Sequence, residues 1–188
     1  MDEAEKVVLD RDDVARAMVR MAHEVVERNT DPSSALAIVG IHRRGVHIAQ
    51  RLHEQISELL GQPVGLGSLD ISFHRDDLGR RPQAPVVHST EIDFALDGAT
   101  VVIVDDVLFT GRTVRSAIDA LFEYGRPARV QLAVLVDRGH RELPIRPDYV
   151  GKNLPTSLTE RVNVSIEEID GSDQVTIGVA PATAGVTG

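Results

Sequence analysis

The sequence predicts an α/β fold, a central mostly parallel sheet flanked by helices, and two observations carry this prediction. Short runs of branched apolar residues at 35–41, 101–104 and 130–136 have the composition of strands buried on both faces. Segments with apolar residues at helical spacing separate these runs, which is the strand–helix alternation of parallel sheets. The 188 residues suffice for one such domain, which we expect at 1–177.

The first helix is expected to run to about Arg28. Either Asp10 or Asp12 could cap its amino end. Its buried stripe would consist of apolar residues three or four positions apart, namely Val14, Met18, Met21, Val25 and Val26.

A second helix follows the strand at 35–41 and ends at Gly61, and 64–73 has the pattern of another strand. The next stretch contains glycine and proline with little periodicity. A long loop of this kind in a compact domain is usually a functional lid or a disordered segment. We therefore expect a flexible loop at 75–89.

After the strand at 101–104, a third helix is predicted to stop at Gly125, a residue type that favours the position just after a helix. Residues 161–169 and 175–177 could form a closing hairpin. Residues 178–188 are small, polar and unpatterned, and a disordered tail is expected there.

Charge and cysteine content narrow the class of protein. The net charge is -9, from 20 Lys and Arg against 29 Asp and Glu, so any RNA binding must come from a local basic patch. The absence of cysteine excludes disulfides and thiolate metal sites. No apolar run has the length of a membrane span, and the acidic amino end lacks a signal-peptide pattern. We therefore expect a cytoplasmic protein without a membrane partner.

The chain is organised around the strand at 101–104 and the polar turn directly after it. Two carboxylates, Asp105 and Asp106, end the apolar run, and a short segment with Thr110, Gly111 and Thr113 leads into a helix. A strand, a tight polar turn and a helix amino end leave backbone amides unpaired and pointing one way, which is an arrangement that binds phosphate.

The acidic pair refines this interpretation. A carboxylate beside a bound phosphate would repel it unless the carboxylate faced sugar hydroxyls or a metal ion. A ligand with a phosphate at one end and a hydroxyl-bearing ring fits both the amides of the turn and the acidic pair. The segment is neither a Walker A loop nor a dinucleotide fingerprint. The other interpretation is an ordinary strand-to-helix turn in which the acidic pair has no role.

Two regions carry clustered basic residues. On the first helix, Arg20 and His23 are three residues apart and Arg28 lies two turns beyond Arg20, but interleaved glutamates are also consistent with a solvated face. The segment 137–157 is rich in basic residues, with few acidic ones to oppose them. Such a run suits phosphates or the splayed bases of an RNA hairpin loop.

Three segments carry a family resemblance. Residues 101–113 resemble the phosphoribosyl pyrophosphate (PRPP) motif of type I phosphoribosyltransferases, an apolar strand, two acidic residues and Thr-Gly-x-Thr. Together with 135–145 and 148–153 they resemble the bifunctional pyrimidine operon attenuators that are also uracil phosphoribosyltransferases. The similarity runs from about residue 7 to 177. It implies the type I phosphoribosyltransferase fold, with a small hood at about 137–157 plus the amino-terminal segment.

The resemblance implies a reaction in which uracil and PRPP give UMP and diphosphate, with Mg²⁺ held mainly through PRPP and by no protein cage. Asp105 and Asp106 would hold the ribose hydroxyls and stabilise positive charge on the ribose, and Arg75 would meet the leaving diphosphate. The phosphate site would comprise Val107, Leu108, Phe109, Thr110, Gly111, Arg112 and Thr113. The base site would comprise Arg138, Tyr149 and Val150, through backbone groups near these residues that could bind the uracil edge.

The loop at 42–45 occupies the position of the family's pyrophosphate loop, which often contains a non-proline cis peptide. The diphosphate site would comprise His42, Arg43, Arg44 and Gly45. The other interpretation is an exposed basic turn. The family commonly has Thr where Arg43 stands, which leaves the role of Arg43 open.

The resemblance also implies binding of a leader mRNA hairpin when UMP or UTP is plentiful. The RNA-binding residues would be Arg20, His23, Arg28, His140, Arg141, Arg146 and Lys152. This requires the fold to bring the first helix and the segment 137–157 together. The rival hypothesis is a salvage phosphoribosyltransferase without an RNA role, for uracil or another base such as a purine. A homodimer or higher homo-oligomer is implied by the family alone.

Overall fold

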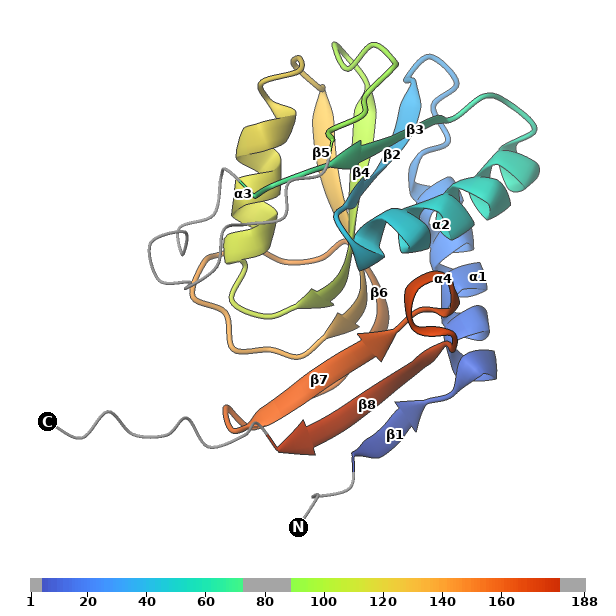
Figure 1. Ribbon diagram of the computed structural model, residues 1–188. Helices are drawn as coiled ribbons and strands as arrows, with labels where there is room; N and C mark the ends of the chain where they lie inside the picture. Colours follow the sequence, from blue (N-terminus) through green and yellow to red (C-terminus); the bar gives the residue numbers. More distant parts are fainter. Residues whose placement is uncertain (1–4, 73–88, 180–188) are drawn as a thin grey trace, which may run out of the picture.

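Two β-sheets frame the molecule. The computed structural model describes residues 5–72 and 89–179. The larger sheet is parallel, in the order β3-β2-β4-β5-β6, and the smaller one is antiparallel, in the order β1-β8-β7 (Figure 1). The strands of the larger sheet are β2 (Leu36–Ile41), β3 (Gly65–Leu69), β4 (Thr100–Leu108), β5 (Arg129–Asp137) and β6 (Tyr149–Asn153). This confirms the predicted fold class.

Helices cover both faces of the larger sheet because successive residues of a strand enter opposite cores. Val102 of β4 packs in one core with α1 (Arg11–Arg28) and α2 (Arg44–Leu60). Val101 packs in the other with α3 (Arg112–Leu121). Burial on both faces explains why this strand is a continuous apolar run.

The ends of the first two helices follow local sequence signals. Asp10, and not Asp12, caps α1: its carboxylate accepts a hydrogen bond from the Asp13 amide at 2.8 Å, and the Asp13 carboxylate accepts one from the Asp10 amide at 3.2 Å. Helix α1 ends at Arg28, as predicted. Helix α2 ends before Gly61, which takes the left-handed conformation.

The smaller sheet and a short helix form a unit that we call the hood. It consists of β1 (Lys6–Leu9), β7 (Glu160–Ser165), α4 (Glu167–Asp170) and β8 (Gln174–Val179). The amino-terminal segment contributes β1 to it. The expected position at 137–157 is wrong, because β6 within that segment pairs in parallel with β5 and completes the larger sheet.

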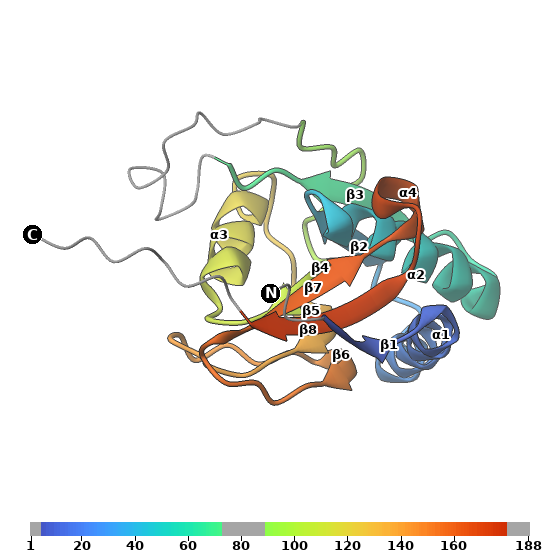
Figure 2. The ribbon, with the colours of Figure 1, turned by 60° about the horizontal axis from the view of Figure 1, so that its bottom comes forward.

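The hood faces the carboxyl ends of β4 and β5, and the loops after β2, β4 and β5 leave the larger sheet at that edge (Figures 1 and 2). This edge is where open parallel α/β sheets bind ligands. The expected hairpin is confirmed as the antiparallel pair of β7 and β8. Most of the predicted loop at 75–89, and 180–188 of the predicted tail, lie outside the described residues, while β8 extends to Val179. Within the described ranges, no helix is both long and apolar enough to cross a bilayer.

Candidate active site

Asp105 and Asp106 lie inside β4, near its carboxyl end. The strand continues to Leu108, beyond the apolar run, because it pairs with β5 as far as the register Leu108–Asp137. Asp105 is only 7% exposed, and its carboxylate accepts a hydrogen bond from the Asp106 amide at 2.9 Å. The Asp106 carboxylate accepts one from the Val107 amide at 2.8 Å. These contacts with the following amides orient both carboxylates at the ligand-binding edge.

Residues 109–113, between β4 and α3, are called the phosphate loop below. The carbonyl of Thr110 accepts hydrogen bonds from two amides in the segment after β5, those of Glu142 at 3.0 Å and the next residue at 3.2 Å. The carbonyl of Phe109 accepts one from Arg141 Nη1 at 2.9 Å. These carbonyls point toward the segment after β5. The amides of the loop therefore point away from that segment and remain available to a ligand.

The amides of Thr110, Gly111 and Thr113 have no acceptor among the residues that the structure describes. Gly111 is the N-cap of α3 and has φ 94°, a conformation that L side chains rarely adopt. Unpaired amides at the amino end of a helix attract anions. The phosphate loop therefore has the backbone geometry that the predicted phosphate site requires.

A second loop, residues 42–45 between β2 and α2, lies directly on β4 and is called the diphosphate loop below. Its peptide bond between His42 and Arg43 is cis, as expected from the resemblance. A Cβ at Gly45 would lie 2.5 Å from the carbonyl oxygen of Val104. Only glycine permits this approach, which places the start of α2 beside the acidic pair.

Arg44 of the diphosphate loop is held in a fixed contact, while Arg43 is exposed. Arg44 Nε and Nη2 donate to the two carboxylate oxygens of Asp170 in α4, at 3.1 and 2.9 Å. This hydrogen-bonded pair raises the pKa of Arg44 and lowers the pKa of Asp170. A cleft of about 350 Å³ lies here between the hood and the larger sheet, and it is lined by Arg44, Asp106, Val107, Arg161, Val162, Asn163, Val164 and Ser165.

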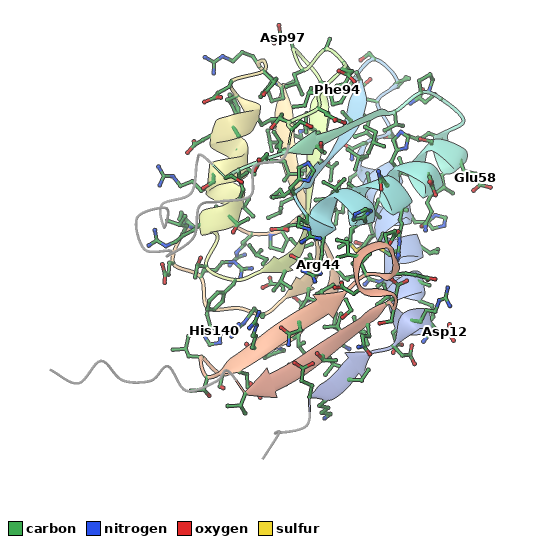
Figure 3. All side chains as sticks on the ribbon, in the orientation of Figure 1. Asp12, Arg44, Glu58, Phe94, Asp97 and His140 are labelled. Atoms are coloured by element: carbon green, nitrogen blue, oxygen red, sulfur yellow. The ribbon has the colours of Figure 1, made fainter. Side chains whose placement is uncertain are left out.

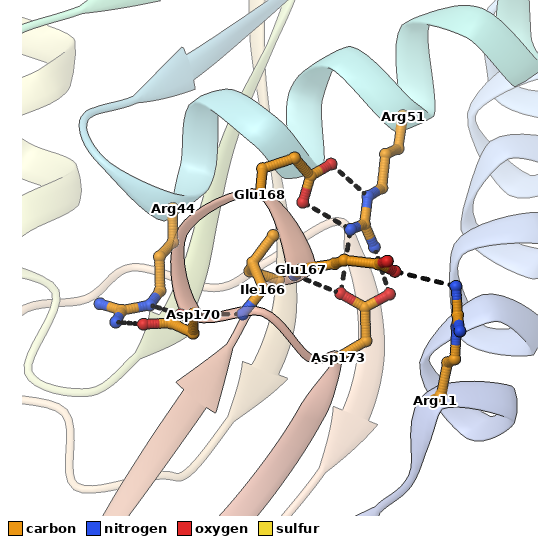
Figure 4. A network of polar contacts seen from close by, with 8 residues as sticks. All are labelled: Arg11, Arg44, Arg51, Ile166, Glu167, Glu168, Asp170 and Asp173. Carbon is orange, nitrogen blue, oxygen red and sulfur yellow. Dashed lines mark hydrogen bonds and ion pairs between the residues drawn. The ribbon is translucent and has the colours of Figure 1, made fainter.

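Two further arginines fasten the hood (Figure 4). Arg51 of α2 donates to Glu168 at 2.6 and 2.9 Å and to Asp173 at 2.9 Å, while Arg11 of α1 donates to Glu167 at 2.8 Å. Hydrogen bonding to Arg51 lowers the pKa of Glu168. Burial alone would raise the pKa of Asp173, but hydrogen bonds from Arg51 and a backbone amide outweigh burial and lower it. The hood is thus attached to the helix that begins at the diphosphate loop.

Arg138, predicted to contact the base, is 8% exposed and connects two loops. Its Nε donates to Thr156 Oγ1 at 3.1 Å, and Nη2 donates to the carbonyls of Ser157 and Glu160 at 3.2 and 2.9 Å. Its guanidinium also stacks on Phe109, and its amide donates to the carbonyl of the last β4 residue at 3.1 Å. Burial lowers the pKa of Arg138, but a guanidinium remains charged. Arg138 therefore joins the β6–β7 connection to the phosphate loop.

The side chain of Tyr149, also predicted to contact the base, lies in the core and is 1% exposed. Its hydroxyl donates to Gln131 Oε1 at 3.0 Å and accepts from Asn29 Nδ2 at 3.1 Å, and burial raises its pKa. The carbonyl of Val150 accepts a hydrogen bond from Arg20 at 3.1 Å. A contribution of Tyr149 and Val150 to base binding thus stays a prediction about their backbone.

The fold brings α1 and β6 together, as the RNA hypothesis requires. Arg20 donates to the carbonyls of Val150 and Gly151, and Arg28 donates to the carbonyl of Asp148 at 3.3 Å. Three further predicted RNA contacts are exposed, namely His23, Arg146 and Lys152.

The other two predicted RNA contacts, His140 and Arg141, are engaged elsewhere. A ring nitrogen of His140 bonds the Thr156 carbonyl, and Arg141 donates to the Asp137 carboxylate at 2.6 Å. Figure 3 shows His140 beside the hood and away from α1. The structure therefore does not place these two residues with Arg20 and Arg28.

Three residues near this edge were not predicted from the sequence. Thr156 and Leu158 lie on the β6–β7 connection, where Leu158 is 72% exposed, and Asp170 had no predicted role in the site. Leu158 could have been noticed as an isolated apolar residue in a polar loop. Asp170 left no local signal, because its partner Arg44 lies 126 positions away in the sequence. One predicted site residue, Arg75, lies outside the described residues.

Comparisons with known proteins show the family and the fold of the chain. The model of the phosphoribosyl transferase domain family matches residues 7–167. A bifunctional protein PyrR of Roseiflexus sp. (strain RS-1) is 56% identical over 96% of this chain and 99% of its own, and one of Pelotomaculum thermopropionicum is 54% identical over 90% and 93%. Among solved structures, a hypoxanthine phosphoribosyl transferase of Trypanosoma cruzi aligns with a TM-score of 0.71 and 18% identity over 94% of this chain and 92% of its own. A hypoxanthine phosphoribosyltransferase of Staphylococcus aureus aligns with a TM-score of 0.68 and 18% identity over 96% and 94%.

Proposed function

The chain belongs to the phosphoribosyl transferase domain family and, within it, to the bifunctional PyrR proteins, and on this basis we propose that it is a uracil phosphoribosyltransferase that also attenuates transcription of the pyrimidine operon. The observation that carries the enzymatic half is the acidic pair beside the amide-lined phosphate loop. One end of this site suits a phosphate and the other suits sugar hydroxyls.

In the proposed reaction, the bond between ribose C1′ and the diphosphate oxygen of PRPP breaks. A bond from C1′ to uracil N1 forms, and the N1 proton is released. The phosphate loop binds the 5′-phosphate through the amides of Thr110, Gly111 and Thr113. Asp105 and Asp106 hold the 2′- and 3′-hydroxyls and stabilise positive charge on the ribose. Uracil is acidic enough that a strong general base is not needed.

The diphosphate loop is proposed to receive the leaving diphosphate through its backbone and through Arg44. Arg75 is kept as a proposed diphosphate contact outside the described residues. Magnesium would fit this site as a companion of PRPP, because the diphosphate and waters can supply its oxygen ligands beside the carboxylates of Asp105 and Asp106. When bound, the ion would neutralise charge on the leaving group, with Asp105 and Asp106 nearby.

An assay of diphosphate release from PRPP tests the enzymatic half, with uracil, hypoxanthine, guanine and adenine each offered as the base. We expect release with uracil and none above background with the purines. The double variant Asp105→Asn, Asp106→Asn should abolish release while it keeps the fold. Full activity in that variant would remove the acidic pair from the mechanism, and preference for a purine would replace uracil as the substrate.

The regulatory half rests on the membership in the PyrR group and on the basic residues of α1 that lie along β6. A leader hairpin would bind there more tightly when UMP occupies the nucleotide site. By linkage, the RNA would then tighten UMP binding by the same factor. The test is titration with leader RNA, with and without UMP, over a range of salt. A nucleotide effect and a steep salt slope support the regulator, and their absence leaves a salvage enzyme.

The family also suggests a homodimer or higher homo-oligomer, which sedimentation of the purified chain would test. Of the seven proposed RNA contacts, His140 and Arg141 are the least direct. Both would have to leave internal hydrogen bonds to reach RNA.

A further inference from the structure

The contact between Arg44 and Asp170 joins the diphosphate loop to the hood. Arg44 is the first residue of α2, and Asp170 is the last residue of α4, 126 positions later. Figure 4 shows Arg44 and Arg51 reaching from α2 to α4. Of these two arginines, only Arg44 also lines the cleft that contains Asp106. The two arginines thus make similar ionic contacts with the hood, and one of them does so at the proposed reaction centre.

The carboxylate of Asp170 is itself held in place. Its Oδ2 accepts a hydrogen bond from the Ile166 amide at 2.9 Å, and the Asp170 amide donates back to the Ile166 carbonyl at 2.7 Å. A carboxylate fixed in this way can set the direction of a planar guanidinium that it binds through two parallel hydrogen bonds.

The two contacts to Asp170 use one edge of the Arg44 guanidinium. They occupy Nε and Nη2, while Nη1 has no acceptor among the residues at 5–72 and 89–179. Nη1 carries two N–H donors, and the side chain borders the cleft. A phosphate oxygen in the cleft could therefore take these donors without displacing Asp170.

We propose that Asp170 is a positioning residue for the transfer reaction: it holds the Arg44 guanidinium so that the free edge binds the diphosphate of PRPP. This deepens the proposed function and rests on it. Without Asp170, Arg44 would retain its charge but would have to be ordered when the ligand binds, which costs conformational entropy. Asp106 in the same cleft would also attract the unheld guanidinium. The loss should fall on diphosphate and PRPP and not on the base.

The test compares Asp170→Asn with Glu168→Gln. Glu168 lies two residues earlier in the same helix and pairs with Arg51, which does not line the cleft. For each variant we would measure KM for PRPP, KM for uracil, the affinity for magnesium diphosphate by calorimetry without substrate, and the urea midpoint. Arg44→Lys provides a second variant, because it keeps the charge and loses the planar fork.

We expect Asp170→Asn to raise KM for PRPP and weaken diphosphate binding about tenfold, the size of one charge-assisted hydrogen bond, with KM for uracil unchanged. Arg44→Lys should act in the same direction. Glu168→Gln should lower the urea midpoint and leave KM for PRPP, KM for uracil and the diphosphate affinity at wild-type values.

Equal KM for PRPP in Asp170→Asn and wild type would overturn the proposal. An equal rise in KM for PRPP in Asp170→Asn and Glu168→Gln would also overturn it, because a loosened hood alone would explain such a rise. If Asp170→Asn does not fold, wild-type diphosphate affinity in Arg44→Lys would overturn it. A wild-type chain that neither binds diphosphate nor releases it from PRPP would instead contradict the proposed function.

Discussion

The guanidinium carbon of Arg138 lies 4.2 Å from the centroid of the Phe109 ring, so a buried cation holds the β6–β7 connection against the phosphate loop. The same guanidinium donates to the carbonyls of Ser157 and Glu160 on that connection. Two loops that are remote in sequence are therefore kept at a fixed spacing. This relationship gives the Arg138 side chain a structural role, while base binding by backbone groups near Arg138 stays a prediction.

Arg138→Gln should destabilise the protein by about 2 kcal/mol, because carbonyl oxygens of the β6–β7 connection and an aromatic face lose their charged partner. We also expect a higher KM for uracil, since the spacing of the two loops is no longer fixed. Urea unfolding and initial rates measure the two effects. Arg146→Gln, in the same segment but exposed, is the matched control and should change neither quantity. Wild-type values for Arg138→Gln would show that the link is dispensable.

Tyr149→Phe separates a core role of the Tyr149 side chain from a role in base binding. The variant loses the hydrogen bonds to Gln131 and Asn29 and should unfold with about 1 kcal/mol less free energy. KM for uracil should stay at the wild-type value, because the side chain is buried in the core. A selective rise in that KM, with unchanged stability, would mean that the Tyr149 hydroxyl itself takes part in base binding.

Gly45→Ala tests the close approach of the diphosphate loop to β4. The added Cβ would lie 2.5 Å from the Val104 carbonyl oxygen, so the start of α2 must move. We expect a loss of about 1–3 kcal/mol in stability, as for other overpacked sites, together with a higher KM for PRPP. Gly61→Ala is the control, because it strains a left-handed residue in open space at the far end of α2. That variant should lose stability while its KM for PRPP is unchanged, and the same result for Gly45→Ala would contradict the argument.

The hood attachment predicts a stability change in acid. Arg51 lowers the pKa of Glu168 below its ordinary 4.5 and helps to lower the pKa of Asp173 below its ordinary 3.8. A group whose pKa is lowered by folding stabilises the protein above its unfolded pKa, and this stability is lost as the pH falls through the folded pKa. The free energy of unfolding should therefore decline as the pH falls below about 4.5, and less steeply in Arg51→Met. Because Glu168 is partly exposed, its share of the effect is reduced by solvent screening. Urea unfolding across this pH range measures the slopes, and equal slopes would rule out the attachment as their source.

The sequence was sufficient where local patterns decide the structure. The run at 101–104 predicted a buried strand, and the segment with Thr110 and Gly111 predicted a turn into a helix, because strand burial and helix amino ends leave short-range signatures. The hood was misplaced because 137–157 lacks the apolar pattern of a central strand. Strand β6 joins the sheet at its edge and has two exposed residues at its end. Contacts such as Arg44 with Asp170 depend on how distant segments dock, for which no local pattern exists.

The position of Arg28, at the end of α1 and beside the start of β6, yields the prediction that separates a regulator from a salvage enzyme. Arg28 is exposed at the end of α1 and is held beside β6 by its contact with Asp148, so a phosphate could bind there with little reordering of the side chain.

Arg28→Gln should weaken leader RNA binding and reduce the slope of log K against log salt by about 0.7–0.9, the contribution of one phosphate contact. Diphosphate release from PRPP should be unaffected, because Arg28 does not line the cleft. Arg16→Gln is the control on the same helix, where the arginine pairs with Asp13 and forms no hydrogen bond or ion pair with the described residues of β6. If Arg16→Gln and Arg28→Gln lower the affinity equally, RNA is responding to the overall charge of α1, and if neither does, this face of the protein does not bind RNA.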